Sequence, residues 1–314
     1  MSEARATGPG VSGAATSGAE ARGAAPTIHD LGYKRYDGPR TPHRRRYLTV
    51  MRLALKQSLK WWLWVTLVFA VAQVAIFGVV MYFLGRAAAV PGAGLAADVI
   101  RPDFLVLKLL TEWYGVIPLC FVVGLFAGGS SIADDARTGA FQFYFSRPVS
   151  KEHYLLGKLI AVCGLTCLVA VAPAVVLCLV RAAISPPNQM PAAGLLLLKG
   201  VALGLVVGLA LGIPVVALSS LSTSRGVVQG GWAAVFMLSW IIGGIVSSVT
   251  VSPWPELISI PANLKVFGAF VFGEPSPDRL PWWACALVLG GILAASAALL
   301  RWRLRHVESI QVSS

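Results

Sequence analysis

The sequence predicts an all-α polytopic membrane protein, and its composition and apolar segments support that prediction. Of the 314 residues, 56% are hydrophobic and only 13% are charged, whereas a soluble domain usually carries about a quarter charged residues. Six apolar segments match the length of roughly 20 residues that a transmembrane helix needs. We expect Pro173 to interrupt the third of them, as membrane helices tolerate. The predicted spans are residues 61–84, 114–132, 154–180, 194–221, 227–249 and 282–300.

Two segments of different composition precede the first span. Residues 1–28 are mostly Ala, Gly, Ser, Thr and Pro without an apolar run, so we expect a disordered tail. They are not expected to act as a signal peptide, because no apolar core follows their few charges. Residues 29–46 form a basic and aromatic lead-in, which suits an anionic membrane surface or an acidic partner.

Residues 47–60 have the pattern of an amphipathic helix that lies in the membrane interface. Its apolar residues recur at three- and four-residue steps, and basic residues fall on a neighbouring face. The alternative is that this segment extends the first transmembrane helix. Three tryptophans then indicate an aromatic belt at the level of the lipid headgroups. The apolar stripe is Leu48, Met51, Leu55 and Leu59, the basic face includes Arg52, Lys56 and Lys60, and the belt is Trp61, Trp62 and Trp64.

Two connections between the spans contain apolar pieces that are too short to cross a bilayer. Residues 104–110 form one such piece in the first connection. The linker 252–281 contains two more, at 257–260 and 266–272. We expect re-entrant or interfacial helices in this linker, directly before the sixth span.

The fourth span carries glycines at every fourth position, which places them on one side of a helix and lets another backbone approach closely. This packing stripe consists of Gly200, Gly204, Gly208 and Gly212. The pattern alone leaves two partners open, another helix of the same chain or a second protomer.

Basic residues predict the orientation of the spans. The chain has 26 Lys and Arg against 14 Asp and Glu, but these charges flank the apolar spans, so we expect membrane lipid and no nucleic acid as the partner. Most Lys and Arg lie on the side that contains both termini and the connection between spans 2 and 3. The positive-inside rule therefore predicts that this side, including the tail 306–314, is cytoplasmic.

The connection between spans 2 and 3 is the only conspicuous polar cluster in the hydrophobic part of the sequence. It begins with Asp134, Asp135 and Arg137, continues through a break at Thr138 and Gly139, and then becomes aromatic. Aromatic anchors next to basic residues are typical of protein interfaces, so we expect a short cytoplasmic helix that docks a partner. The alternative is an aromatic belt that rests on lipid headgroups. The candidate docking residues are Phe141, Phe143, Tyr144, Phe145, Ser146, Arg147, Pro148, Val149, Lys151 and Glu152.

Enzyme chemistry finds no support in the sequence. Asp134 and Asp135 are adjacent, so on a helix they point about 100° apart and do not form a facing pair of carboxylates. No glycine-rich phosphate loop with the spacing G-x-x-x-x-G-K-[ST] occurs. The five cysteines lie in or beside apolar spans, where buried thiols are expected rather than a metal site.

At the polar cluster the chain resembles the permease subunits of type-2 ATP-binding-cassette (ABC-2) transporters. The matching features are an acid at Asp134 or Asp135, the Thr138-Gly139 break, Ser146-Arg147-Pro148, and Gly157-Lys158. In this chain the acid is Asp where Glu is common, and the order at the break is Thr-Gly-Ala. The basic and aromatic segment 31–40 also looks like one found in bacterial permeases of this group, and the resemblance extends over residues 47–305.

This resemblance implies a six-helix permease that works as an exporter in a bacterial plasma (inner) membrane. It implies a separate cytosolic ATPase subunit that binds ATP and Mg²⁺, a cytoplasmic coupling helix between spans 2 and 3, and a second permease copy or a paralogue that completes a dimer. Asp134, Asp135, Arg137 and Gly139 would then cap the spans and transmit movement of the ATPase. A helix-end ion pair is the simpler alternative for these residues.

Two other functions remain open at this stage. A membrane anchor or scaffold that transports nothing could recruit a soluble partner through the basic residues 29–46. Secondary transport driven by ions is disfavoured because the spans lack obvious intramembrane acids.

Overall fold

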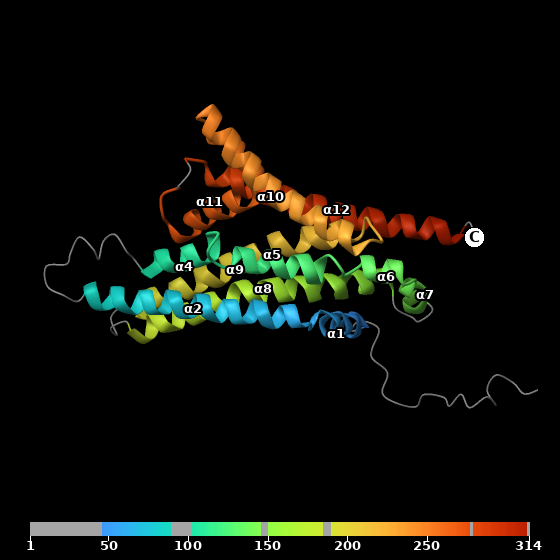
Figure 1. Ribbon diagram of the computed structural model, residues 1–314, viewed down its shortest axis with the longest axis horizontal. Coiled ribbons are helices and arrows are strands. Elements are labelled where there is room, and N and C mark those ends of the chain that lie inside the picture. The colour runs from blue at the N-terminus through green and yellow to red at the C-terminus, as the bar shows by residue number, and fades with distance from the viewer. Residues whose placement is uncertain (1–45, 89–101, 146–149, 185–189, 277–278, 313–314) are drawn as a thin grey trace, which may run out of the picture. The chain divides into compact units, whose positions relative to one another are not determined.

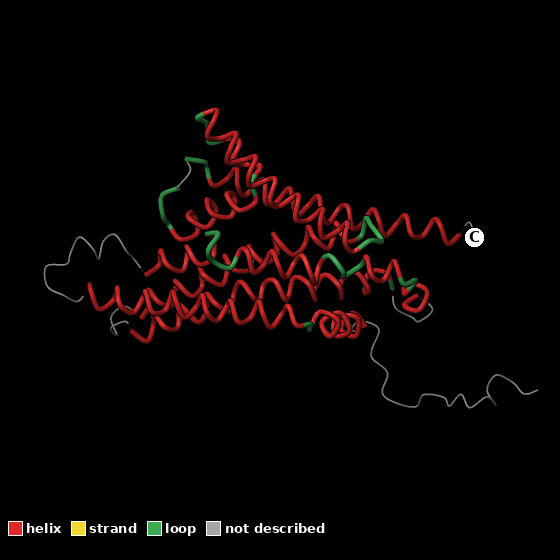
Figure 2. The backbone as a smooth tube through the Cα atoms, in the orientation of Figure 1, coloured by secondary structure: helices red, strands yellow, loops and turns green. Residues whose placement is uncertain are grey.

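The spans predicted from hydrophobicity are helices in the structure. The computed structural model describes residues 46–88, 102–145, 150–184, 190–276 and 279–312, and all regular elements in those ranges are helices (Figure 2). Among these helices, six are long and apolar enough to cross a membrane, so the chain is a multi-pass membrane protein. The predicted tail 1–28 and nearly all of the lead-in 29–46 lie outside the described residues.

Five of the six spans begin and end within about five residues of their predicted bounds, whereas the helix of the sixth span continues well beyond its predicted end at residue 300. The six spans comprise α2 (Trp61–Ala88), a composite second span (Ile117–Arg137), α8 (Lys151–Ile184), α9 (Met190–Ser219), α10 (Arg225–Thr250) and α12 (Trp282–Val312). The composite span contains α5 (Ile117–Val123), a π-helical turn η3 (Gly124–Gly128) and α6 (Ala133–Arg137). In α8 the expected interruption at Pro173 does not occur, and the helix continues through it.

Helices α8 and α9 pack along each other (Figure 1), and the glycine stripe of α9 makes this possible. A Cβ atom on Gly208 would lie 2.6 Å from the Cα of Cys167, and one on Gly204 would lie 2.9 Å from Val171. Thr166 of α8 also donates a hydrogen bond to the carbonyl oxygen of Gly208. The stripe therefore packs inside this chain, against α8 at all four glycines, and Val106 of α4 also lies beside Gly200.

The apolar piece expected within the first connection is a buried helix, α4 (Pro102–Thr111). Leu109 and neighbouring residues of α4 are fully buried against α8, α9 and α11. The chain then turns sharply at Gly115, where a Cβ would lie 2.0 Å from the carbonyl oxygen of Leu109. Gln73 of α2 fixes this turn by donating to the carbonyl oxygens of Tyr114 and Gly115.

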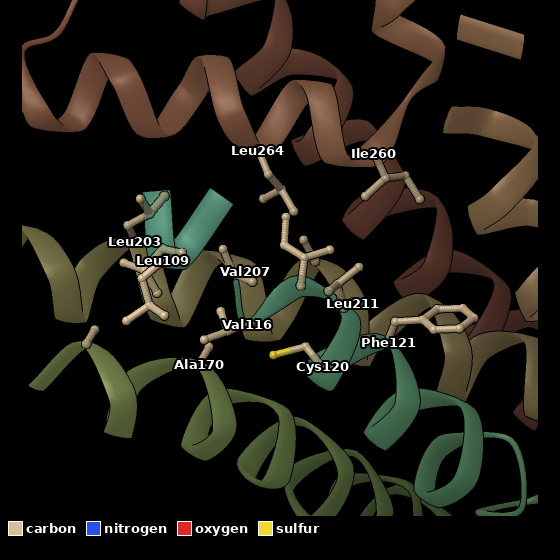
Figure 3. Close-up of a cluster of buried hydrophobic side chains, with 14 of the residues drawn as sticks. Leu109, Val116, Cys120, Phe121, Ala170, Leu203, Val207, Leu211, Ile260 and Leu264 are labelled. Carbon is tan, nitrogen blue, oxygen red and sulfur yellow. The ribbon is translucent and has the colours of Figure 1, made fainter. Parts of the chain in front are cut away.

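A hydrophobic core forms where α4, α5, α8, α9 and α11 meet (Figure 3). Its side chains come from segments far apart in sequence and bury apolar surface that a bilayer would otherwise cover. Cys120 is among them, and four of the five cysteines are buried. The core residues labelled in Figure 3 are Leu109, Val116, Cys120, Phe121, Ala170, Leu203, Val207, Leu211, Ile260 and Leu264.

The predicted amphipathic segment forms its own helix, α1 (Arg46–Ser58), and α2 begins after a break at Leu59 and Lys60. The alternative of one continuous helix is therefore wrong. The packing face also differs from the predicted leucine stripe, because the buried residues of α1 are Val50 and Ala54. Small side chains allow α1 to approach Gly157 of α8 closely, and Leu59 stays exposed.

The expected tryptophan belt is only partly present. Trp61 and Trp64 are exposed, but Trp62 is buried and stacks on Phe126 of the second span, with ring centroids 5.4 Å apart. Its apolar surface is thus covered by protein rather than by lipid headgroups.

The linker before the last span contains two helices, as predicted. They are a 3₁₀ turn η5 (Trp254–Ile258) and α11 (Ile260–Phe272). Ser259 caps α11 by accepting from the backbone N–H of Ala262, and Gly273 ends it in the left-handed region with φ 77°. Lys199 donates to the carbonyl oxygen of Phe272, where a positive charge is favourable at the end of a helix.

Candidate functional site

The polar cluster between spans 2 and 3 folds as two short helices separated by a tight turn. Helix α6 ends at Arg137, and the hydroxyl of Thr138 donates to the carbonyl oxygen of Asp134 over 2.9 Å. Gly139 follows with φ 67°, a backbone conformation that side chains with a Cβ disfavour. Helix α7 (Ala140–Phe145) then begins in a new direction. The break expected at Thr138 and Gly139 is therefore a capped helix end followed by a left-handed glycine.

A buried ion pair joins the end of the second span to the start of the third. Asp135 Oδ2 lies 2.8 Å from the Nζ of Lys158, and their side chains are 8% and 2% exposed. The hydroxyl of Tyr154 donates to the same carboxylate oxygen over 2.7 Å. Because Asp135 and Lys158 are both satisfied, their charges can stay inside an apolar helix bundle. These three residues, Asp135, Tyr154 and Lys158, form what we call the buried triad.

Helix α7 rests on the buried triad through its aromatic side chains. Phe141 meets the ring of Tyr154 edge-on with centroids 5.5 Å apart, and Tyr144 lies 5.1 Å from the same ring. Burial, with a smaller contribution from the charge of Asp135, raises the pKa of Tyr144 to about 12, so its phenol stays protonated at neutral pH. Phe141 and Tyr144 therefore hold α7 against the spans.

The first charged residues of the cluster point in different directions, as expected for neighbours on a helix. Asp135 faces inward to Lys158, while Asp134 lies 3.8 Å from the exposed Arg137. The carboxylate of Asp134 thus forms only a weak ion pair with Arg137 at the surface.

Helix α8 begins where the cluster ends. The Ser150 hydroxyl accepts from the backbone N–H of His153 and also contacts the ring nitrogen of that residue. Lys151 is half-buried and Glu152 is exposed in the first turn.

Gly157 and Lys158 have separate structural roles. A Cβ on Gly157 would lie 2.8 Å from both the carbonyl oxygen of Tyr47 and the Cβ of Val50, so this glycine lets α1 dock on α8. Lys158 faces the other way, into the triad. From the sequence, Lys158 was used only to predict topology and as part of the resemblance to permeases, and its ion pair was not predicted. Its position inside an apolar helix is the signal that could have indicated a buried partner.

Ser219, at the end of α9, was not predicted from the sequence as part of the site. Its hydroxyl accepts from the backbone N–H groups of Ile132 and Ala133 and donates to the carbonyl oxygen of Gly129. These bonds satisfy the backbone where η3 gives way to α6, and they tie α9 to the base of the cluster. No local pattern marks the residue, because its partners lie 86 to 90 residues earlier.

Most of the remaining predicted docking residues lie wholly or partly outside the part of the chain that the structure describes. Phe143 and Phe145 belong to α7, but their side chains lie outside the described residues. Ser146, Arg147, Pro148 and Val149 lie outside them entirely.

The carboxylate of Asp135 is held by a lysine and a tyrosine of the third span. Among the residues that the structure describes, no cluster of three or more His, Cys, Asp or Glu could hold a metal ion.

Comparison with known proteins gives no relative from which to assign a function. The chain matches neither a protein-family model nor a curated protein sequence.

Proposed function

We propose that this chain is the permease subunit of an ABC-2 type transporter, which works as an exporter with a separate cytosolic ATPase. The sequence resemblance at the polar cluster suggests this family, and the multi-pass helical fold agrees with it. In this proposal both termini and the α6–α7 connection face the bacterial cytoplasm. ATP and Mg²⁺ bind to the partner subunit.

The observation that best supports the proposal is the way in which α7 packs on the ends of the spans. This short helix lies between two spans, and its aromatic residues Phe141 and Tyr144 press on Tyr154. Tyr154 in turn bonds to Asp135, which pairs with Lys158 of the third span. A force on α7 would therefore reach the ends of two spans through direct side-chain contacts that lead to a buried ion pair. An element that only rested on lipid headgroups would not need this buried polar connection.

A second permease copy has suitable surfaces to bind. Most of the second span and of α9 is buried within the chain, whereas α2 and α10 bury little of their apolar length. Exposed apolar residues of α10 include Val235, Leu238, Ile242 and Val249. In the proposed dimer, such faces meet either lipid or the other permease.

Co-purification tests whether α7 and the residues after it dock an ATPase. The full chain is co-expressed with an ATP-binding-cassette ATPase encoded beside it, and Phe145, Arg147 and Pro148 are replaced together by alanine. We expect association to be lost, because aromatic and arginine anchors carry much of the energy of an interface. The matched control is Arg225→Ala, which removes a cation from the start of α10.

A second variant separates docking from coupling. Tyr154→Phe keeps the ring on which Phe141 and Tyr144 pack and removes only the hydrogen bond to Asp135. Hydrogen bonds to charged groups contribute about 1.5–3 kcal/mol, so we expect normal ATPase binding with about a tenfold weaker effect of the permease on ATP hydrolysis. Intact association of the triple-alanine variant would refute the docking role. A soluble partner that binds residues 29–46, with no ATPase bound, would favour the anchor function.

A further inference from the structure

A polar cavity lies beside the buried triad, between α1, the second span and α8. Its volume is about 310 Å³, which exceeds the roughly 30 Å³ share of a single water molecule several-fold. Hydroxyl side chains and two carboxylates line it, together with the last turn of α1. The lining includes Gln57, Ser58, Lys60, Ser130, Ser131, Asp134, Asp135, Thr138 and Lys158.

Two oxygen atoms of this cavity lack a hydrogen-bond partner among the described residues. Ser131 is only 7% exposed, and its hydroxyl oxygen makes no hydrogen bond. The Oδ1 atom of Asp134 also makes no hydrogen bond, although the side chain as a whole is 32% exposed, because Arg137 approaches this atom only to 3.8 Å. Buried polar atoms are normally satisfied. The carboxylate of Asp134 and the hydroxyl oxygen of Ser131 can therefore each accept a hydrogen bond from a ligand. A positively charged donor suits the carboxylate best.

The other carboxylate of the cavity does not compete for this donor. Asp135 is neutralised by Lys158 at 2.8 Å and also accepts from Tyr154. The nearby Lys158 ammonium disfavours a bare divalent cation, because a metal ion would meet one available carboxylate and an adjacent positive charge. A primary ammonium group, which is monovalent and donates up to three hydrogen bonds, suits the site better.

The rim of the cavity has the opposite charge. Lys60 is exposed and follows the end of α1, and Gln57 is exposed one turn earlier. Both can donate to an anionic group that sits outside the buried acceptors. The site is thus negative inside and positive at its rim, which matches a ligand with an ammonium and a phosphate separated by a short linker.

The surroundings of this site are typical of the level of lipid headgroups. The amphipathic helix α1 ends at Ser58, and the exposed tryptophans Trp61 and Trp64 follow immediately, which is typical of the membrane interface. An apolar groove of about 550 Å³ starts at the neighbouring Leu59 and continues between α2 and α8 past Leu67, Ala70 and Pro173. This apolar groove could accommodate the acyl chains of a bound lipid.

We propose that the cavity binds the headgroup of an aminophospholipid such as phosphatidylethanolamine. The ammonium lies between Asp134 and Ser131, and the phosphate lies at Lys60. The lipid then ties α1 to the ends of the second and third spans. This site does not depend on the proposed transport function, since it is argued from the side chains of the cavity alone.

Native mass spectrometry of the purified full chain tests the proposal without a mutation. The protein is titrated with phosphatidylethanolamine, its N-methylated forms, phosphatidylcholine and phosphatidylglycerol, all with the same acyl chains. We expect phosphatidylethanolamine to bind about tenfold more tightly than phosphatidylcholine, because each methyl group removes one donor to a charged acceptor. Equal binding of these two lipids would overturn the proposal. Free phosphoethanolamine serves as a soluble probe, and binding as tight as that of the lipid would show that the site takes a soluble ligand instead.

Matched variants locate the preference. Asp134→Asn and Ser131→Ala should each reduce the difference in affinity between phosphatidylethanolamine and phosphatidylcholine. Lys60→Gln should weaken the binding of all the phospholipids tested. Ser220→Ala and Lys56→Gln are the controls, since neither residue lines the cavity. A preference that persists in Asp134→Asn would contradict the assigned position of the ammonium.

Discussion

Lys158 and Asp135 show how single residues join two spans of this protein. An ammonium group inside an apolar helix is costly unless it is paired, and here a carboxylate lies 2.8 Å away with a tyrosine hydroxyl on the same oxygen. Asp135 could be identified from the sequence as part of a polar cluster. Its partner could not, because the pair is made by residues from different helices, α6 and α8, that only the tertiary fold brings together.

A double-mutant cycle tests the pair. Lys158→Met and Asp135→Asn should each lower the free energy of unfolding by about 3–5 kcal/mol, because each leaves one buried charge uncompensated. The double variant leaves no charge, and the amide oxygen that Asp135→Asn introduces can still accept from Tyr154. We therefore expect it to be more stable than the sum of the single effects predicts, by about 1.5–3 kcal/mol. Thermal and denaturant unfolding in one detergent measure this, and strictly additive losses would mean that the two charges do not interact.

At the scale of elements, the length of an apolar segment decides how well the sequence predicts it. The six spans were predicted because about 20 apolar residues leave few other structures possible. The apolar piece 104–110 is shorter, and its helix α4 is stabilised by contacts with α8, α9 and α11 that no local pattern reveals. For the same reason, the apolar stripe of α1 did not reveal its contact with α8, which is made at Gly157 by Val50 next to the buried Ala54.

The orientation of α7 is another feature that the sequence left open. Its aromatic residues indicated an interface, but not which of them face the chain itself. Phe141 and Tyr144 pack on Tyr154, so their contribution is to seat the helix. Contact with a partner then depends on the residues that follow them, which stays a prediction.

Gly157 provides a test of how α1 is held. Gly157→Val should displace α1, because the new side chain would overlap the backbone of Tyr47 and the side chain of Val50, and overpacking of this kind costs about 1–3 kcal/mol. A cysteine placed at Val50 should then react with a maleimide about tenfold faster, since about 1.4 kcal/mol of lost packing raises the population of the open state by that factor. Gly164→Val is the control on the same helix, since nothing lies within 4 Å of its Cβ position. Equal reactivity in the two variants would show that α1 is held elsewhere.

At the scale of the whole molecule, the ends of the spans differ in character. One end contains α1, the buried triad, α7 and the Ser219 hydrogen bonds, and Arg303 of α12 also donates there to the carbonyl oxygen of Ser220. Helix α10 starts beside that turn and ends at Thr250, and Val251 follows as its C-cap. If the distribution of basic residues sets the orientation, the first end is cytoplasmic and Val251 faces the opposite side.

The most direct test of the proposed function is the side of the membrane on which the α6–α7 connection lies. Single cysteines are placed at Glu152, beside this connection, and at Val251, both of which are exposed, in a chain without its native cysteines. Intact cells are treated with a membrane-impermeant maleimide. We predict that Val251→Cys is labelled in intact cells and Glu152→Cys only after the membrane is opened. Labelling of Glu152→Cys in intact cells would contradict the proposal, because no cytosolic ATPase could then reach α7.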